Sequence, residues 1–192
     1  MKNIIIIGGG GHAKVVISII KKLKTYNIIG YTDIYNNGDI LGVSYIGNDN
    51  KVLNYSKQTL LALGIGQINN LDFIRKIVTY FIDQGYSFAT LISPDSIINE
   101  DVNIGVGTVI MDGAVINCCT IIGEYSIINT KVSIDHDCNV GEFVHLAPGA
   151  TICGNVNIGR GSFIGAGSTI INNIKLECNS FIKAGKLLRN IK

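Results

Sequence analysis

The spacing of apolar residues divides the chain into two parts. From Ile98 to Leu188, every sixth residue is Ile, Val or Leu, at sixteen successive positions. A second series, four residues after the first, holds small or β-branched residues, and glycine often follows the aliphatic position. A period of six fits neither a helix nor an alternating hairpin, but it fits one short strand and one turn per repeat. An ordinary β-sandwich would not keep one period over so many repeats. We therefore predict a parallel β-helix of about five coils over residues 96–192, with three hexapeptides in each coil.

The first 95 residues show a different pattern, with short apolar runs that alternate with stretches of helical spacing. This order is typical of a small Rossmann-like βαβ domain of the α/β class. We expect the domain to cover residues 1–95 and to join the β-helix near Pro94, one of two prolines in the chain. The expected strands are residues 4–7, 28–31, 60–65 and 88–92, and the expected helices are residues 13–24 and 71–83.

Composition excludes several classes of protein. Charged residues make up 16% of the chain and the net charge is +2, which excludes a disordered chain and a strong bulk attraction to nucleic acid or anionic membranes. The five cysteines lack C-x-x-C spacing, so neither a disulfide framework nor a thiolate zinc site is indicated. The apolar run near residue 4 is too short for a signal sequence or a membrane span. We expect a cytoplasmic protein.

A run of four glycines follows the first expected strand. Gly8, Gly10 and Ala13 match the pattern G-x-G-x-x-A, and the acidic Asp33 follows twenty residues later, as in the dinucleotide-binding fingerprint. The domain has room for about four strands, which is half of a full dinucleotide fold, so NAD is the less favoured ligand. A glycine turn before a helix can hold the phosphates of a nucleotide-linked ligand. A purely structural turn is the alternative.

Three histidines are candidates for chemistry. His12 begins the first helix, where it either caps the helix or faces a ligand, or simply lies at the surface. His136 lies between two aspartates and points outward from the coil, so it is either merely solvated or oriented by a carboxylate as a general base. His145 precedes an inward Leu146, at an expected corner. The histidines lack the local spacing of a zinc site, and we expect no metal.

Three segments, G-G-G-H-A-K, I-I-N-T-K-V-S-I-D-H-D-C-N-V-G and V-H-L-A-P-G-A-T-I-C-G-N-V-N-I-G, together resemble the bacterial sialic-acid O-acetyltransferase (NeuD/PglD-like) family. Close relatives in that family N-acetylate nucleotide-activated 4-amino sugars that are used for surface glycans. The resemblance covers nearly the whole chain. It implies a left-handed β-helix, a homotrimer, and acetyl-CoA bound between the β-helices of adjacent subunits.

The resemblance also implies roles for individual residues. His136 matches the catalytic base and Asp137 the carboxylate that orients it. Asn129 matches a residue near the acceptor sugar. The residues matched to the acetyl-CoA site are His145, close to the thioester, Gly154, whose backbone N–H would bind the acyl oxygen, Ala166 and Lys183. The residues matched to the nucleotide-sugar site are Gly8, Gly10, Gly11, His12 and Asp33.

The last coil departs from the family pattern. Relatives have a glycine-rich last coil and a V-G-x-P-A tail, whereas this chain reads F-I-K-A-G-K over residues 181–186. Lys183 replaces an expected small residue, and Lys186 falls where the small inward series would continue. With Arg189, these lysines would instead meet the phosphates of the coenzyme.

Three functions follow from these observations. The first is direct transfer of acetyl from acetyl-CoA to the amine of a nucleotide-linked 4-amino-deoxysugar, with His136 as the general base. The second changes the acceptor to a hydroxyl of sialic acid. The third is a non-catalytic β-helix that scaffolds or regulates an enzyme of sugar biosynthesis.

Overall fold

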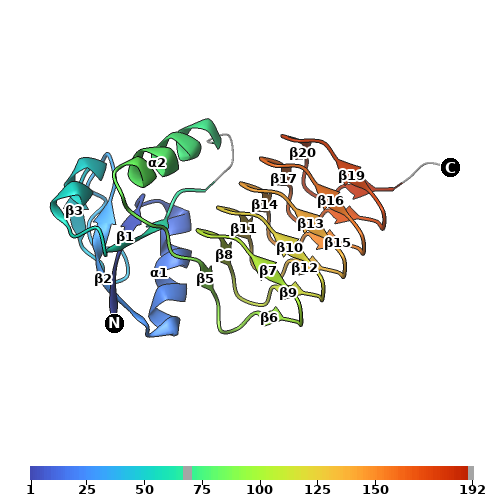
Figure 1. Ribbon diagram of the computed structural model, residues 1–192, viewed down its shortest axis with the longest axis horizontal. Helices are drawn as coiled ribbons and strands as arrows, with labels where there is room; N and C mark the ends of the chain where they lie inside the picture. The colour runs from blue at the N-terminus through green and yellow to red at the C-terminus, as the bar shows by residue number, and fades with distance from the viewer. Residues whose placement is uncertain (67–70, 190–192) are drawn as a thin grey trace. The chain divides into compact units, whose positions relative to one another are not determined.

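The computed structural model describes residues 1–66 and 71–189, which form two compact units, Met1–Leu91 and Ile92–Lys192. The first unit contains a parallel sheet with the strand order β3-β2-β1-β4 (Figure 1). Its elements, in chain order, are β1 (Lys2–Ile7), α1 (Gly11–Leu23), β2 (Tyr26–Thr32), β3 (Tyr45–Gly47), the 3₁₀ helix η1 (Asp49–Asn54), β4 (Leu60–Leu63) and α2 (Leu71–Asp83).

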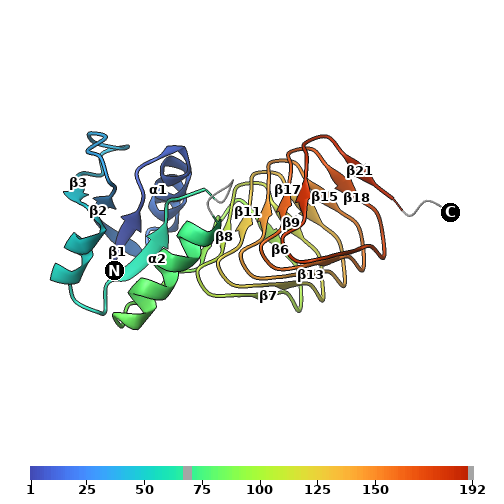
Figure 2. The same ribbon diagram turned by 90° about the horizontal axis from the view of Figure 1, so that it is seen from above.

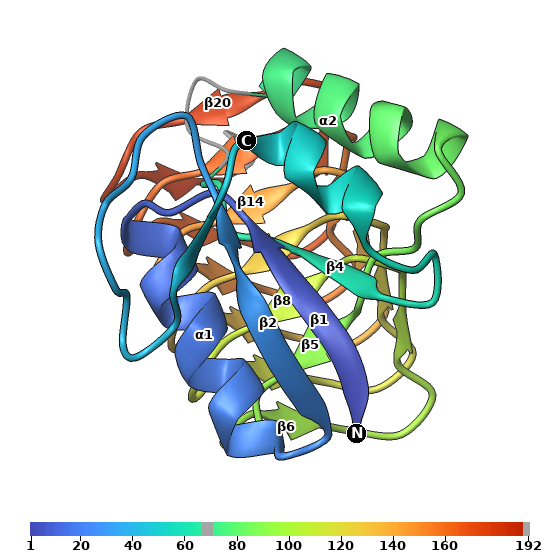
Figure 3. The same ribbon diagram turned by 90° about the vertical axis from the view of Figure 1, so that its left-hand side faces the viewer.

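The sheet of the first unit lies between two helices. Strand β1 is buried from Ile4 to Ile7 because helices cover both faces of a parallel sheet. Helix α1 packs against β1, β2 and β4, and Figure 3 shows α1 and α2 on opposite sides of the strands. The connections that leave β1 and β4 run in opposite directions along the sheet. Because such crossovers are right-handed, their helices α1 and α2 lie on opposite faces of the sheet. The carboxyl end of β1 therefore opens into the glycine turn that precedes α1.

The predicted strand over residues 88–92 is not a single strand of this sheet. Phe88 forms an isolated parallel bridge with Leu61, whereas β5 (Leu91–Ile92) belongs to a sheet of the second unit. A short apolar run can pair with either sheet, and the chain divides the run between them. The sequence pattern also gave no indication of β3 or η1.

The second unit is the left-handed parallel β-helix that the repeat and the family resemblance imply (Figures 1 and 2). Two-residue strands stack into three parallel sheets, and each strand pairs with the strand eighteen residues later, as Ile121 does with Asn139. After β5, the strands are β6 (Ile97–Ile98), β7 (Asn103–Ile104), β8 (Val109–Ile110), β9 (Val115–Ile116), β10 (Ile121–Ile122), β11 (Ile127–Ile128), β12 (Ser133–Ile134), β13 (Asn139–Val140), β14 (His145–Leu146), β15 (Thr151–Ile152), β16 (Asn157–Ile158), β17 (Phe163–Ile164), β18 (Thr169–Ile170), β19 (Lys175–Leu176), β20 (Phe181–Ile182) and β21 (Leu187–Leu188).

Both series of the hexapeptide repeat face the interior of the β-helix. The aliphatic series forms the core, and most of the small series is buried beside it. Buried hydroxyl groups in the small series connect successive coils. Thr120 Oγ1, for example, donates to the backbone oxygen of Asp135 at 3.0 Å and accepts from the backbone N–H of Cys138 at 3.3 Å. These bonds brace the turn that lies between residues 135 and 138.

Candidate active site

His136 and Asp137 form the turn between β12 and β13. Asp137 has a φ of 58°, and its counterparts in the coils before and after, Cys119 and Asn155, have φ values of 59° and 56°. The N–H of Asp137 donates to the backbone oxygen of Cys118 at 3.2 Å, and the backbone oxygen of His136 accepts from the N–H of Asn155 at 3.0 Å. The turn is therefore held by the coils on both sides. Its left-handed conformation is one that aspartate tolerates better than most residues.

The side chains of this turn form a hydrogen-bonded dyad. His136 Nδ1 lies 2.7 Å from Asp137 Oδ2, and the two side chains are 52% and 59% exposed. Because a carboxylate only accepts, this contact places the ring proton on Nδ1 and leaves Nε2 as the basic nitrogen. The hydrogen bond that His136 donates to Asp137 raises the pKa of His136, and the negative charge of Asp135 raises it further. The arrangement is that of an oriented general base.

A column of polar side chains leads up to the dyad. Asn99 Nδ2 donates to Asn117 Oδ1 at 2.7 Å, and Asn117 Nδ2 donates to Asp135 Oδ1 at 3.1 Å. The same oxygen of Asp135 accepts the backbone N–H of His136 at 2.9 Å. From the sequence, Asp135 was recognised only as one of the two aspartates that flank His136, and Asn117 was not recognised. The spacing of eighteen residues between these three positions is the signal that places them in one column.

Gly154 lies directly against the imidazole of His136. A Cβ atom at this glycine would lie 2.8 Å from both Cε1 and Nε2 of the ring. Any larger residue here would therefore displace the imidazole, which gives a structural reason for glycine in addition to the role that the resemblance implies.

His145 lies on β14 rather than at the corner that the sequence suggested. It is the first residue of a two-residue strand, so it points outward while Leu146 points inward. Its side chain is nevertheless only 5% exposed, with Nε2 3.3 Å from Asn129 Nδ2 and the ring edge-on to Phe163 at 5.2 Å. The structure thus brings together Asn129 and His145.

The last coil folds in spite of its two lysines. Strands β20 and β21 pair in register with β17 and β18, and the backbone oxygen of Lys183 accepts a hydrogen bond from Ser168 Oγ at 2.9 Å. The side chains of Lys183 and Lys186 are exposed, as is Ala166 in the turn after β17. Lys186 occupies a position of the inward series, and it is nevertheless exposed in the last coil that the structure describes.

Gly8 and Gly9 are fixed by close contacts within the first unit. A Cβ atom at Gly8 would lie 2.6 Å from Ile65 Cγ1, and one at Gly9 would lie 2.5 Å from the ring of Tyr31. Gly8 also has a φ of 101°, which favours glycine. Their N–H groups are engaged, since Gly8 donates to the backbone oxygen of Thr32 at 2.8 Å and Gly9 donates to Asp33 Oδ2 at 2.6 Å. These two glycines therefore shape the turn.

Gly10 and Gly11 have no such structural reason to be glycine. A Cβ atom at either would meet nothing within 4 Å, and neither residue has a positive φ. Gly10 is the N-cap of α1 and provides no side-chain cap, and the first turn of α1 contains no acidic residue. The first N–H groups of a helix lack partners within the helix and carry a partial positive charge. A backbone without side chains at this point can be approached closely by an anion such as a phosphate.

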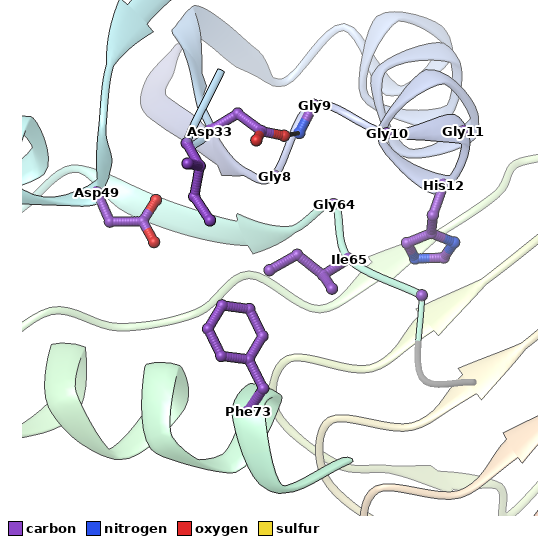
Figure 4. Close-up of a pocket in the computed structure, with 12 residues that line it drawn as sticks. Gly8, Gly9, Gly10, Gly11, His12, Asp33, Asp49, Gly64, Ile65 and Phe73 are labelled. Carbon is purple, nitrogen blue, oxygen red and sulfur yellow. Dashed lines mark hydrogen bonds between the residues drawn. The ribbon is translucent and has the colours of Figure 1, made fainter. Parts of the chain in front are cut away.

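This turn lines a cavity of about 250 Å³ that Figure 4 shows in close-up. The cavity includes all five residues assigned to the nucleotide-sugar site, together with others that the sequence argument missed, among them Ile34, Asp49 and Phe73. His12 Nε2 is a buried nitrogen without a hydrogen-bond partner among the described residues. Burial lowers the pKa of His12 to about 4, so the imidazole is neutral at neutral pH.

Other forms of chemistry find little support in the described part of the chain. Cys138 is buried, its thiol donates to the backbone oxygen of Cys153 at 3.2 Å, and burial raises its pKa, so it is a core residue. Over residues 1–66 and 71–189, no cluster of three or more His, Cys, Asp or Glu side chains could hold a metal ion. Within the same ranges, the helices are too short or too polar to cross a membrane.

Each of the two units matches the model of a known protein family. Residues 3–87 match the model of the PglD N-terminal domain, and residues 137–172 match that of the bacterial transferase hexapeptide (six repeats). A search of curated proteins gave no significant match.

Two solved structures resemble the whole chain. The acetyltransferase domain of PglB from Neisseria gonorrhoeae is 30% identical, with a TM-score of 0.91 over 98% of this chain and 92% of that domain. PerB from Caulobacter crescentus, in complex with CoA and GDP-perosamine, is 29% identical, with a TM-score of 0.89 over 99% of this chain and 90% of that one. The chain therefore belongs to the NeuD/PglD-like family of hexapeptide-repeat sugar acetyltransferases.

Proposed function

We propose that the protein transfers the acetyl group of acetyl-CoA to the amine of a nucleotide-linked 4-amino-deoxysugar, with His136 as the general base. The observation that carries this proposal is the exposed imidazole of His136, whose Nδ1 is 2.7 Å from Asp137 and whose Nε2 borders Gly154. A reaction of this kind supplies acetylated amino sugars for surface glycans. Its two substrates are intracellular metabolites, which favours a cytoplasmic location.

In this mechanism, His136 Nε2 accepts a proton from the amine as the amine nitrogen bonds to the thioester carbonyl carbon. Asp137 holds the ring in the required tautomer and stabilises the imidazolium that forms. The tetrahedral intermediate then collapses with cleavage of the C–S bond, and the imidazolium returns the proton to the departing thiolate of CoA. No covalent enzyme intermediate is needed. The backbone N–H of Gly154 is our candidate donor to the oxyanion, a contact whose loss typically costs about 10²–10³ in rate.

The glycine turn supplies the site for the nucleotide. The unpaired N–H groups at the start of α1 and the open backbone at Gly10 and Gly11 suit a diphosphate, and the Asp33 carboxylate suits the hydroxyl groups of a ribose. A site that suits a diphosphate favours a nucleotide-linked amino sugar as the acceptor. Sialic acid is the less favoured acceptor, because it carries one phosphate when it is activated and none when it is free. PerB was solved with a nucleotide amino sugar and CoA, which supports this class of acceptor.

The coenzyme site would lie along the outer surface of the β-helix. We assign Asn129 to the acceptor sugar and His145, Ala166 and Lys183 to acetyl-CoA, and a related acetyltransferase domain was solved with acetyl-CoA.

We also propose a homotrimer with active sites between subunits. Phe181 is 57% exposed and stacks on Phe163, so these rings offer apolar surface for a neighbouring subunit. Light scattering of the full chain tests this assembly, because a monomeric mass would contradict it.

The acceptor is tested with purified protein, acetyl-CoA and a panel of acceptors. The panel contains UDP-, GDP- and dTDP-linked 4-amino sugars, the corresponding 4-hydroxy sugars, CMP-sialic acid and free sialic acid. We expect release of CoA thiol and formation of an amide with at least one amino sugar, but no reaction of its 4-hydroxy counterpart. Acetylation of sialic acid alone would overturn the proposed acceptor, and no transfer to any acceptor would overturn the proposed function.

A further inference from the structure

Large apolar side chains are exposed at the cavity beside the glycine turn. Ile34, which follows β2, is 74% exposed, and Phe73 on α2 is 48% exposed, yet both line the same cavity together with Ile65. Large apolar side chains that converge on one concave site are typical of a ligand-binding pocket. A flat ring placed between them would cover this surface. The base of a nucleotide has that shape, and the phosphates would lie at the glycine turn of the same cavity.

The polar groups near these apolar side chains restrict which base fits. Asp49, the first residue of η1, lines the cavity, and Figure 4 shows its carboxylate pointing into the cavity and the ring of Phe73 on another side. A carboxylate accepts hydrogen bonds and donates none. Guanine presents two adjacent donors, N1–H and N2–H, which match the two oxygens of a carboxylate. Uracil and thymine present one N–H between two carbonyl oxygens, and adenine and cytosine present an amino group beside an acceptor nitrogen. A carboxylate therefore selects guanine.

The position of Asp49 is fixed before any ligand binds. The hydroxyl of Thr32, which is fully buried, donates to Asp49 Oδ1 at 2.6 Å. A carboxylate accepts about four hydrogen bonds, so this contact orients the group and leaves capacity for a base. Asp33 has a different role, because its Oδ2 accepts the N–H of Gly9 at 2.6 Å and it occupies the position that binds ribose in Rossmann-like folds. A preorganised acceptor of this kind gives affinity at low entropic cost.

We propose that the nucleotide of the substrate is a guanosine diphosphate, with Asp49 as the residue that selects the base and with Ile34 and Phe73 packed against its faces. The inference rests on the proposed function in one respect, namely that this cavity holds the nucleotide of the sugar substrate. It assigns a base to that nucleotide.

Binding of free nucleotides tests the inference without acetyl transfer. Calorimetry of the full chain with GDP, IDP, UDP, dTDP, CDP and ADP compares the bases at constant diphosphate. We expect GDP to bind most tightly, and IDP, which lacks the 2-amino group of guanine, to bind at least about tenfold more weakly, because one charge-assisted hydrogen bond is lost. Equal affinities for GDP and IDP, or tighter binding of UDP, would overturn the base assignment while leaving the proposed function intact. If none of the nucleotides binds, both proposals fail.

Substitutions locate the selectivity in one side chain. Asp49→Asn keeps the shape and an acceptor for Thr32 but removes the charge, and we expect it to abolish most of the difference between GDP and IDP. Asp72→Asn is the matched control, because this exposed carboxylate lies beside Phe73 on α2 but does not line the cavity. Phe73→Ala should weaken all nucleotides by a similar factor. A GDP preference that survives Asp49→Asn would contradict the role of Asp49.

Discussion

The substitution Gly154→Ala adds a single carbon atom, Cβ, beside the proposed base His136. The added Cβ would lie 2.8 Å from Cε1 and Nε2 of His136, whereas ordinary van der Waals contact begins at 3.4 Å. The imidazole must therefore move by about 0.6 Å to restore ordinary contact, and a misplacement of about 1 Å can cost on the order of 10²-fold in rate. We expect kcat to fall by about 10- to 100-fold.

Stability should change little in this variant. The imidazole is 52% exposed, so it can rotate into solvent without opening a cavity in the core. The backbone N–H of residue 154 is also retained. The assay is steady-state acetyl transfer, followed through release of CoA thiol, together with a thermal melt of each variant. A melting temperature close to that of the wild type shows that the loss of rate does not come from unfolding.

The combination with His136→Ala provides the decisive control. If Gly154→Ala acts by displacing the imidazole, it should have almost no effect when the imidazole is already absent. An equal loss in both backgrounds would refute the reasoning, because the effect would then not pass through His136. Unchanged kcat in the single variant would refute it as well.

Three other substitutions test the remaining groups of the two sites. Asp137→Asn should shift the acidic limb of the kcat/KM profile to lower pH, because the carboxylate raises the pKa of His136, and it should also lower the maximum rate; a limb that does not move contradicts the dyad. His12 titrates near 6.5 in the unfolded chain but at about 4 in the folded protein, so stability falls as the pH drops through this window. His12→Gln should therefore reduce the loss of unfolding free energy between pH 7 and pH 4 by up to about 3 kcal/mol, measured with urea; an unchanged loss refutes the buried neutral state. Gly11→Ala, in the first turn of α1, meets open space and introduces a better helix former, so it should not lower the melting temperature but should raise KM for the nucleotide sugar; normal KM would argue against a phosphate at this turn.

The β-helix could be predicted from the sequence because each coil repeats one local solution. An inward aliphatic residue, a small residue and a left-handed turn recur every six residues, so the pattern along the chain equals the pattern in space. The same regularity also aligns side chains of successive coils. Residues eighteen apart lie in one column, and this rule places Asn117 beneath Asp135 and Gly154 above His136.

The nucleotide cavity could be predicted only in part. The glycine turn and Asp33 belong to a recognisable motif, whereas Asp49 and Phe73 come from η1 and α2, which the turn motif does not specify. Asp49 and Phe73 line the same cavity because of the way the chain crosses the sheet, and no spacing of residues in the sequence indicates this path. The burial of His145 is a similar case, since its outward position alone predicts exposure, but Asn129 and Phe163 pack against it.

The role of His136 is tested most directly by single-turnover acetyl transfer with the His136→Ala variant. With saturating acetyl-CoA and an amino-sugar nucleotide that the wild-type protein accepts, the chemical step should slow by about 10²–10⁴-fold while both substrates bind with unchanged affinity. Transfer at the wild-type rate in this variant would contradict the assignment of His136 as the base.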